Sequence, residues 1–402
     1  MAEKHVDVAV VGGGIGGLAA ALALATNGLE VMVLEQAPAL AEVGAGVMLS
    51  PNSLRLLRRW GVGPAVDAVA APIQIESFYR RSDGTPVTRL VTADSNGTIT
   101  CAGIHRADLL GVFAAALPEN VVVQTNKRVT DINSTENVAR LAFEDGSDAV
   151  TANLVVGADG IQSRVQHFVV SPSTPVNSGV VAYRGLLSTE QLADSYNLAT
   201  TCSVWMGDGK HFLTFPVRSG RLVNYVAFLP SVESAAESWS AEGDPRLLQE
   251  AFEGWDPIVV KLLSLIGRTH WWGIYDREPL SRWVRGRVTL LGDAAHAMQP
   301  HMGQGANQAI EDAAALALLL HHYGPKNVND ATATYEALRM EHTARVQGGS
   351  RAQAKRTDSA YDDLSRRDAD LAAGLSFRQF IYDYDVEEQV HAYLGRQGRS
   401  AL

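Results

Sequence analysis

The chain of 402 residues is long enough for two packed lobes and at least one sizeable hydrophobic core. Hydrophobic residues make up 46% of it and charged residues 19%, which is a globular composition and excludes a disordered or fibrous protein. The formal net charge of −10 argues against a nucleic-acid partner, because binding to phosphates requires a cationic surface. A local basic pocket for an anionic substrate is still compatible with that average.

The cysteines and the apolar segments indicate where the protein works. Cys101 and Cys202 are too few and too isolated for a disulfide framework or a zinc site, which favours a reducing compartment. The N-terminus lacks the separate basic, apolar and cleavage regions of a signal peptide, and the apolar stretch 313–320 is too short to span a bilayer. We therefore expect a cytoplasmic protein without a membrane partner.

The first elements of the chain predict a nucleotide-binding type of fold. Residues 6–11 are rich in valine and are followed by glycines, which is typical of a buried strand. Residues 14–27 predict a helix rich in Ala and Leu that ends at Gly28, and residues 31–34 predict a second strand. This order is a βαβ unit, whose crossover should be right-handed.

The middle of the chain predicts hairpins and a sheet. Residues 74–92 form one expected hairpin, with its turn at 82–85. A second hairpin turns at 144–147 and leads into the apolar strand 154–156. Runs of alternating apolar and polar residues within 178–230 predict an antiparallel sheet.

The last third of the chain predicts a return to α/β structure and then helices. The Ser-, Ala- and Glu-rich segment 231–247 is expected to be an exposed connection. Residues 287–291 predict a buried strand, followed by a glycine-rich loop and a helix over 306–322. From Asp330 onward the pattern is mostly helical, and we expect its charges to lie on solvated faces.

A first chemical motif, Gly12-Gly13-Gly14-Ile15-Gly16-Gly17, lies between the first strand and the first helix and fits G-x-G-x-x-G. Gly12 permits a tight turn, Gly14 lets the backbone approach a pyrophosphate, and Gly17 allows close contact between helix and strand. Glu35 ends the second strand, where a carboxylate can accept hydrogen bonds from ribose hydroxyls. The context predicts dinucleotide binding, whereas the glycines alone would also fit an ordinary turn.

Two further motifs follow later strands. Gly157-Ala158-Asp159-Gly160 comes directly after a strand and, taken alone, is equally typical of a plain turn. Gly292-Asp293-Ala294-Ala295-His296 also follows a strand, and the loop 300–307 then leads into a helix whose first N–H groups can face an anion. We expect Asp293 to meet a ribose or ribityl hydroxyl.

The three motifs together, spanning residues 8–315, resemble the class A FAD-dependent aromatic hydroxylases. That family carries G-x-G-x-x-G, then Gly-Ala-Asp-Gly, then Gly-Asp-Ala-Ala-His followed by Pro-x-x-Gly-x-Gly-x-Asn. Arg106 fits the family's Arg-x-Asp-Leu element, which touches the flavin. Finer segments are similar to the branch of salicylate hydroxylase, 3-hydroxybenzoate 6-hydroxylase and 6-hydroxynicotinate 3-monooxygenase: residues 42–46, 51–52, 182–185, 276–280 and 308–312.

The resemblance implies FAD as cofactor, NADH or NADPH as co-substrate, and O2. The expected reaction is hydroxylation, through a flavin C4a-hydroperoxide, of a small phenolic ring that is often carboxylated, or of a hydroxypyridine. It implies an α/β fold, with a Rossmann-like FAD-binding lobe, an inserted antiparallel β-sheet lobe for the substrate, and C-terminal helices. We expect the FAD-binding domain to comprise residues 1–73, 98–175 and 280–345, the substrate-binding domain 74–97 and 176–279, and the C-terminal helical segment 346–402.

The same resemblance implies which residues meet the cofactor and the substrate. The expected FAD contacts are Gly12, Gly14, Ile15, Gly17, Glu35, Gly46, Arg106, Asp159, Asp293, Gly303, Gly305, Ala306 and Asn307. His211 and His301 match histidines of the hydroxynicotinate enzyme, and an imidazole titrates near neutrality, so each is a candidate base or hydrogen-bond donor. His296 is expected to order the flavin loop.

The candidate substrate contacts include one departure from the family. Phe215 stands where relatives place a tyrosine, so one ring-oxygen partner is missing, and we expect Tyr225 on the neighbouring strand to substitute. Cys202 matches a position of the hydroxynicotinate enzyme, although a packing role is favoured. Arg184 is a candidate for binding a carboxylate, with a salt bridge inside the fold as the alternative. An aromatic slot or plain core packing would explain Trp205, Phe212, Phe215 and Tyr225 equally well.

Other activities stay open at this point. A flavin halogenase would carry Trp-x-Trp, which the sequence lacks. A flavin reductase or epoxidase of the same fold fits the motifs as well, and a non-catalytic dinucleotide sensor leaves the glycine loop unexplained. The sequence does not specify the substrate, the carbon hydroxylated, loss of a carboxylate, NADH against NADPH, or the oligomeric state, for which a homodimer is the working hypothesis.

Overall fold

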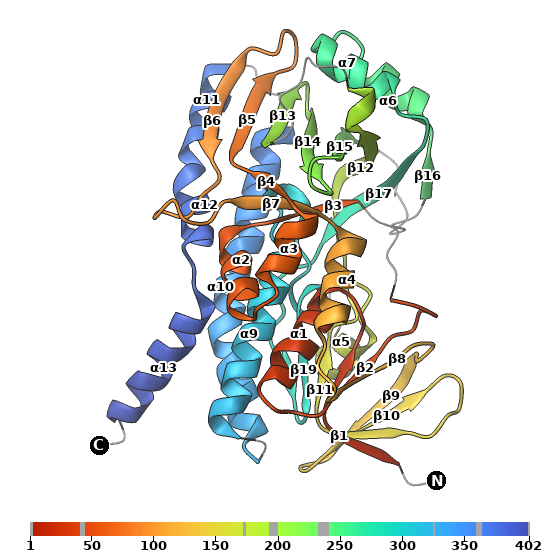
Figure 1. The fold of residues 1–402 in the computed structure, drawn as a ribbon, viewed down its shortest axis with the longest axis vertical. Helices are drawn as coiled ribbons and strands as arrows, with labels where there is room; N and C mark the ends of the chain where they lie inside the picture. The colour runs from red at the N-terminus through yellow and green to blue at the C-terminus, as the bar shows by residue number, and fades with distance from the viewer. Residues whose placement is uncertain are drawn as a thin grey trace.

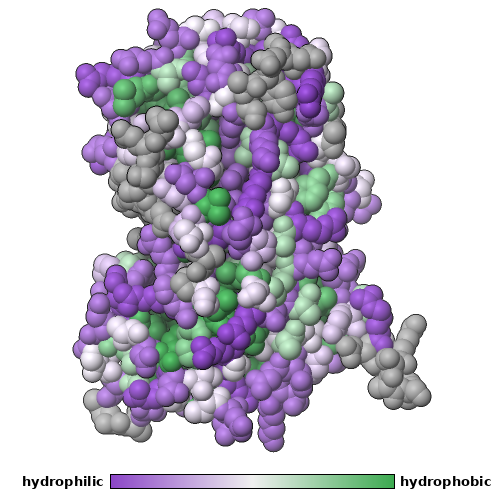
Figure 2. All heavy atoms as spheres, turned by 180° about the vertical axis from the view of Figure 1, so that it is seen from behind, coloured by the Kyte–Doolittle hydropathy of each residue, from purple (hydrophilic) through white to green (hydrophobic). Residues whose placement is uncertain are grey.

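The computed structural model has two lobes that lie one above the other, with long helices along one side (Figure 1). Among the residues described, no helix combines the length and the hydropathy needed to cross a membrane. From behind, the molecule narrows between its two parts (Figure 2). The structure describes residues 3–40, 45–171, 174–192, 200–231, 241–324, 326–358 and 364–400.

The first lobe is built on a mixed sheet whose parallel part contains the predicted βαβ unit. β1 (Lys4–Val11) pairs in parallel with β2 (Val31–Leu34) on one side and with β11 (Val150–Gly157) on the other. α1 (Ile15–Thr26) connects β1 to β2 and is buried along most of its length, because Ala and Leu occupy nearly every position. The sheet continues with β8 (Val121–Gln124), β19 (Val288–Leu290), β18 (Val284–Arg285), and the hairpin of β9 (Val129–Ser134) and β10 (Ala139–Phe143).

A small three-stranded sheet stands between this lobe and the second one. It consists of β3 (Gly46–Leu49), β7 (Cys101–His105) and β4 (Ala71–Ile73). Residues 42–44, part of one segment with family resemblance, lie outside the described residues. The helices attached to the first lobe here are α2 (Pro51–Arg59), α3 (Gly63–Val69), α4 (Arg106–Ala116) and α5 (Arg164–Val169).

The second lobe is an eight-stranded sheet in the order β16-β17-β12-β15-β14-β13-β5-β6. Its strands are β5 (Ile75–Arg80), β6 (Pro86–Val91), β12 (Val176–Ser188), β13 (Thr201–Gly207), β14 (Lys210–Val217), β15 (Leu222–Pro230), β16 (Ala241–Gly243) and β17 (Thr269–Asp276). The strand pairs within 178–230 are antiparallel, as predicted, and β13 pairs in parallel with β5, which comes from an earlier part of the chain. The chain between them passes through the first lobe, which supplies the long crossover that parallel strands require.

The segment 231–247, expected to be an exposed connection, contains structure in its described part. Residues 241–243 form β16 against β17, and α6 (Pro245–Ala251) follows at once, while residues 232–240 lie outside the described residues. The helix begins because the Asp244 side chain accepts a hydrogen bond from the Arg246 N–H and proline occupies the first helical position. With α7 (Pro257–Ser264), α6 covers the sheet on the face away from the first lobe (Figure 1).

The C-terminal helices connect the lobes rather than only presenting charges to solvent. α8 (Asp293–His296) is short, and α9 (Gly305–Tyr323) packs on α1 and on α10 (Val328–Asp358). α10 also contacts β13, β14 and β15, so it reaches the substrate sheet from the first lobe (Figure 1). One face of α10 buries polar residues, including Arg339 and Gln347, which corrects the expectation of wholly solvated charges. The chain ends with α11 (Leu364–Ala373), α12 (Leu375–Tyr382) and α13 (Val386–Ser400).

Candidate active site

The first glycine motif forms the turn between β1 and α1, where the backbone packs too closely for side chains. Gly12 has φ +108°, and a Cβ there would lie 2.4 Å from the Ala158 carbonyl oxygen. A Cβ on Gly17 would lie 1.9 Å from the carbonyl oxygen of Gly12. Both positions therefore require glycine, and the second motif packs directly against the first.

The N-terminus of α1 is open to an anion within the described part of the chain. No side chain caps it at Gly14, and its first turn holds no acidic residue. The Gly13 N–H donates a hydrogen bond of 2.7 Å to the Glu35 carboxylate, which brings this acid beside the turn. Free N–H groups and a helix dipole at such a position suit a pyrophosphate.

Asp159 of the second motif has a local structural role. Its carboxylate accepts hydrogen bonds from the backbone N–H groups of Arg164 at 2.7 Å and Val165 at 3.2 Å, and from the Ser163 hydroxyl. Burial raises the pKa of Asp159, although these hydrogen bonds oppose that effect. The residue thus holds the turn that starts α5.

The third motif places its glycine loop at the start of α9. Gly292 and Gly303 both have φ +62°, in the left-handed region that glycine tolerates best. Asp293 is exposed, and it lines the same cavity as Gly303, Gly305 and Ala306.

Asn307 is not among the residues that line this cavity. Its fully buried amide donates to the carbonyl oxygens of Met48 at 3.0 Å and Gly303 at 2.6 Å, and accepts from the Ser50 N–H at 2.9 Å. It therefore ties the loop to β3 and α2. Its side-chain amide is therefore bonded entirely within the protein.

A fully buried ionic network supports the loop from behind. Arg339 donates to Asp312 and to Glu311, each at 2.7 Å. Asp312 also accepts from the Gly292 N–H at 3.0 Å and lies 2.6 Å from His296 Nε2, so His296 does hold the loop. Burial alone would raise the pKa of Asp312, but His296 and Arg339 keep it at about 2. No motif pointed to Arg339, since nothing local marks one arginine in a charged helix as buried.

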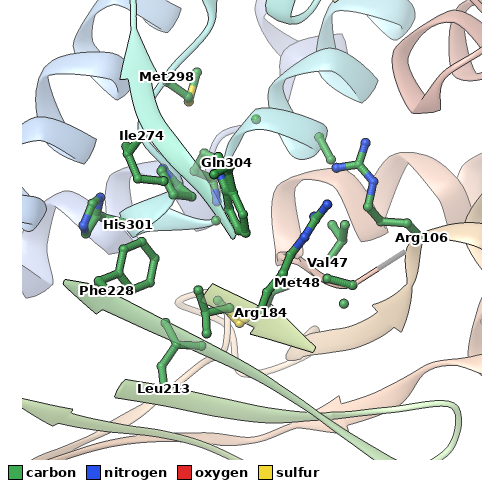
Figure 3. Close-up of a pocket in the computed structure, with 18 of the residues that line it drawn as sticks. Val47, Met48, Arg106, Arg184, Leu213, Phe228, Ile274, Met298, His301 and Gln304 are labelled. Carbon is green, nitrogen blue, oxygen red and sulfur yellow. The ribbon is translucent and has the colours of Figure 1, made fainter. Parts of the chain in front are cut away.

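A cavity of about 250 Å³ lies between the two lobes. Residues of β3 and of the glycine loop line it on one side, together with Arg106 and Asp293. Side chains of the second sheet line the other side, and Figure 3 shows Arg184, Leu213 and Phe228 projecting toward it. The cavity therefore needs both lobes.

Side-chain alternation on the second sheet decides which aromatic residues reach the cavity. Phe215 and Phe228 line it. Trp205, Phe212 and Tyr225 instead pack into the apolar cluster beneath α6 and α7. Of the two alternatives, core packing therefore holds for these three residues, because successive residues of a strand point to opposite faces.

Tyr225 does not replace the missing tyrosine at position 215. Its ring is fully buried on the far face, and its hydroxyl lies 3.5 Å from the Arg268 carbonyl oxygen. Burial raises the pKa of Tyr225 to about 12. On the same strand Val226 and Phe228 line the cavity, and Tyr225 is offset from them by an odd number of positions.

Two histidines share one carboxylate at the cavity wall. His301 lines the cavity, and its Nε2 lies 2.6 Å from Oδ2 of Asp358, the last residue of α10. His211 Nδ1 bonds Oδ1 of the same carboxylate. The His211 ring stacks on Phe228 with a centroid distance of 4.1 Å, so it lies behind a cavity-lining residue and does not itself line the cavity.

The protonation of this cluster follows from its burial. Burial lowers the pKa of His301, although Asp358 acts in the opposite direction. Burial also opposes ionisation of Asp358, but His211 and His301 outweigh it and lower the pKa of that carboxyl below its usual range. The arrangement is thus a carboxylate beside a neutral His301. Asp358 was missed from the sequence because it belongs to no motif.

Arg184 and Cys202 are two further polar groups of the cavity, whose lining also includes Glu76, Tyr275 and Gln304. The Arg184 guanidinium stacks over Trp272 at 4.5 Å from the ring centroid and points into the cavity (Figure 3). Burial raises the pKa of the Cys202 thiol to about 12, so it stays protonated and offers a small, weakly polar surface.

Comparison with known proteins identifies the family. Residues 5–349 match the family described as FAD binding domain. A 6-hydroxynicotinate 3-monooxygenase of Bordetella bronchiseptica is 35% identical, over 85% of this chain and 89% of that protein. A salicylate hydroxylase of Pseudomonas putida is 36% identical, over 85% and 82% respectively. A solved salicylate hydroxylase substrate complex has a TM-score of 0.84 at 28% identity, covering 96% of this chain and 98% of that one.

The chain therefore belongs to the FAD-binding-domain family and is an FAD-dependent aromatic-ring monooxygenase. This confirms the predicted class and fold, and it favours the hydroxylase over the reductase and epoxidase alternatives. FAD is the cofactor, with NADH or NADPH as co-substrate. The uncapped helix α1, the obligatory glycines and the glycine loop at α9 suit a long phosphate-containing cofactor. When bound, FAD supplies the redox and oxygen chemistry.

Proposed function

We propose that the enzyme hydroxylates a small phenolic ring carrying a carboxylate, or a hydroxypyridine of the same kind, with NADH or NADPH and O2. The observation that carries this proposal is the pairing of Arg184 and His301 in one cavity beside the glycine loop of α9. One group is a permanent cation and the other is a buried neutral imidazole. A ring with an anionic group and a hydroxyl complements both.

Arg184 is the proposed carboxylate partner. A guanidinium binds a carboxylate through two parallel hydrogen bonds, and stacking on Trp272 keeps the Arg184 plane fixed. Leu213, Phe215 and Phe228 provide apolar contact for the ring faces. Phe215 contributes no hydroxyl, so ring oxygens depend on the histidine cluster.

His301 is the proposed base for the ring hydroxyl. Removing that proton makes the ring electron-rich, which is what attack by an electrophilic oxygen requires. The Nδ1 of His301 is buried and has no hydrogen-bond partner among the residues that the structure describes. A substrate hydroxyl would satisfy this atom. His211 is proposed to assist from behind Phe228.

The cofactor contacts and the domain division are also proposals. We infer that FAD meets the glycine turn with Glu35 at its adenosine end, and Gly46, Arg106, Asp293 and the loop 303–306 at its flavin end. The two large sheets support the proposed FAD-binding and substrate-binding domains. α10 runs without a break through position 345/346, where the C-terminal segment was expected to begin.

We also propose that the protein is a cytoplasmic homodimer without a nucleic-acid partner. Size-exclusion chromatography tests the dimer, and cell fractionation tests the location.

The test is a substrate panel of salicylate, hydroxybenzoates and hydroxypyridines. The purified protein should be yellow, and at least one carboxylated compound should stimulate NAD(P)H oxidation and yield a hydroxylated product. Product identification is essential, because uncoupled oxidation yields only peroxide. A colourless protein after reconstitution with FAD, or oxidation without any ring product across the panel, contradicts the proposal.

A further inference from the structure

We propose that Asp358 is the positioning residue of this site: it bridges His301 and His211 and so holds His301 in the tautomer whose Nδ1 is a bare acceptor at the cavity. This inference rests on the proposed function. It concerns a residue at the end of a helix that none of the cofactor motifs includes.

The bridge uses both oxygens of the carboxylate. Oδ2 of Asp358 lies 2.6 Å from His301 Nε2, and Oδ1 bonds His211 Nδ1. The three side chains are 9% exposed or less, so water does not compete strongly for these hydrogen bonds. Because His211 occupies one oxygen, the carboxylate cannot turn away from His301.

The hydrogen-bonding capacities decide the tautomer. An ionised carboxylate only accepts, so the nitrogen that faces it must carry the proton. A neutral imidazole has one N–H, and in His301 this is Nε2–H, which leaves a lone pair on Nδ1. That Nδ1 is the atom without a partner among the described residues. Because His301 lines the cavity, we infer that this lone pair is the acceptor that a substrate hydroxyl meets when it binds.

The proton transfer balances within this group. The ring O–H bond breaks and a bond from the proton to His301 Nδ1 forms, giving a phenolate and an imidazolium. Nε2–H stays bonded to Asp358, whose negative charge stabilises the imidazolium without becoming protonated. On product release the proton returns from Nδ1 to the ring oxygen or to solvent. His211 keeps its own proton and acts on the position of the carboxylate.

The same three side chains also resemble a metal site, since their ligand atoms lie within 4.8 Å of one another. The direct contacts favour hydrogen bonding, because a nitrogen of each imidazole already lies within hydrogen-bond distance of its own carboxylate oxygen. Metal analysis of the purified enzyme separates the two interpretations. A stoichiometric transition metal, removed by a chelator together with activity, would overturn the proposal.

The experiment compares Asp358→Asn and Asp358→Glu with wild-type holoenzyme. An asparagine keeps the shape but offers one acceptor and one donor, so one imidazole must change its tautomer. Asp368→Asn is the matched control, because Asp368 pairs with Arg80 and Arg367 and with neither histidine. FAD absorbance and thermal unfolding verify that each variant is folded and loaded.

Two readouts distinguish positioning from a structural role. The first is the absorbance of 4-hydroxy-3-nitrobenzoate bound at a pH where the free phenol is mostly un-ionised. Wild type and the control should bind it as the phenolate, and Asp358→Asn as the phenol. The second is steady-state hydroxylation of the best compound of the panel, where kcat should fall about 100-fold or more in Asp358→Asn, with KM changed only a few-fold.

Asp358→Glu keeps an acceptor at both imidazoles, so it should bind the probe as the phenolate and recover part of the lost kcat. If Asp358→Asn does not retain FAD, the test uses Asp358→Glu, and the absorbance of the bound probe shows whether it is the phenolate. The role of Asp358 would be overturned if Asp358→Asn bound the phenolate and kept the wild-type kcat, or if a folded Asp358→Glu bound the phenol. Either result would leave the proposed function standing. If wild type hydroxylates nothing in the panel, the proposed function fails and this inference fails with it.

Discussion

Two buried ionic clusters lie along α10, and one difference separates what they can do. Around Arg339, the guanidinium and the carboxylates of Glu311 and Asp312 bond one another, and none of these three side chains lines the cavity. Around Asp358, the carboxylate is 9% exposed, and His301 lines the cavity with a buried Nδ1 that has no partner among the described residues. A cluster whose charges are all compensated inside the protein stabilises it. A cluster with one lone pair at a cavity can react.

The largest expected effect is on stability, in the Arg339 network. Arg339→Met should lower the free energy of unfolding by about 3–5 kcal/mol, because it leaves Glu311 and Asp312 as uncompensated buried carboxylates. FAD content should fall as well, since Asp312 holds the Gly292 N–H. Denaturant unfolding and flavin absorbance measure both effects. Arg345→Met, at an exposed position of the same helix, is the control and should change neither.

The next largest effect is on catalysis, at His301. His301→Gln should reduce kcat for hydroxylation about 100- to 10,000-fold, the range for losing a general base. Stability and FAD content should change little. His270→Gln on β17, outside the cavity lining, should keep wild-type rates. If His301→Gln kept full coupled activity, the cluster around Asp358 would have no catalytic role, and the two clusters would not differ in function.

Replacing Arg184 tests the carboxylate end of the cavity. Arg184→Met should raise KM for a carboxylated substrate about 10- to 100-fold, because a charge-assisted hydrogen bond contributes about 1.5–3 kcal/mol. The analogue without the carboxylate should bind wild type and variant alike. Equal increases of KM for both compounds would instead point to a packing role.

The pH dependence sharpens the comparison further. His301 acts as a base only when neutral, and burial holds its pKa below the 6.5 of a free imidazole. Coupled hydroxylation should therefore be constant down to about pH 6.5 and decline only below it. Stability should decline in the same direction, because below about pH 6.5 the unfolded chain takes up a proton that the folded state resists. This assignment would be contradicted if hydroxylation by the wild type already declined on acidification above pH 6.5. It would also be contradicted if the same decline persisted in His301→Gln.

The smallest effect is expected at Tyr225. Tyr225→Phe removes a hydroxyl that lies 3.5 Å from the Arg268 carbonyl oxygen and also interacts with Thr269. The free energy of unfolding should change by less than about 1 kcal/mol, and the substrate profile should be unchanged. Loss of hydroxylation in this variant would show that Tyr225 reaches the ring after all. Phe212→Leu in the same cluster gives the comparison for packing alone.

Local sequence was sufficient for features that depend on near neighbours. The valines of β1, the glycines of its turn and the alanines of α1 each prescribe one conformation, so the βαβ unit follows from residues 4–34. The hairpin β5–β6 and the strands β12, β14 and β15 follow from alternation and turn residues in the same way. Even the missed helix α6 had a local signal in Asp244-Pro245.

The sequence by itself determined the family, the cofactor and the glycine framework, because backbone contacts to a phosphate-bearing ligand demand particular residues at fixed spacing. Only the tertiary structure decided that Tyr225 faces away from the cavity, that Arg339 is buried, and that Asp358 joins His211 to His301. These pairings bring together residues separated by up to 147 positions. Their energies come from long-range burial and charge compensation, and no short segment of the chain encodes them.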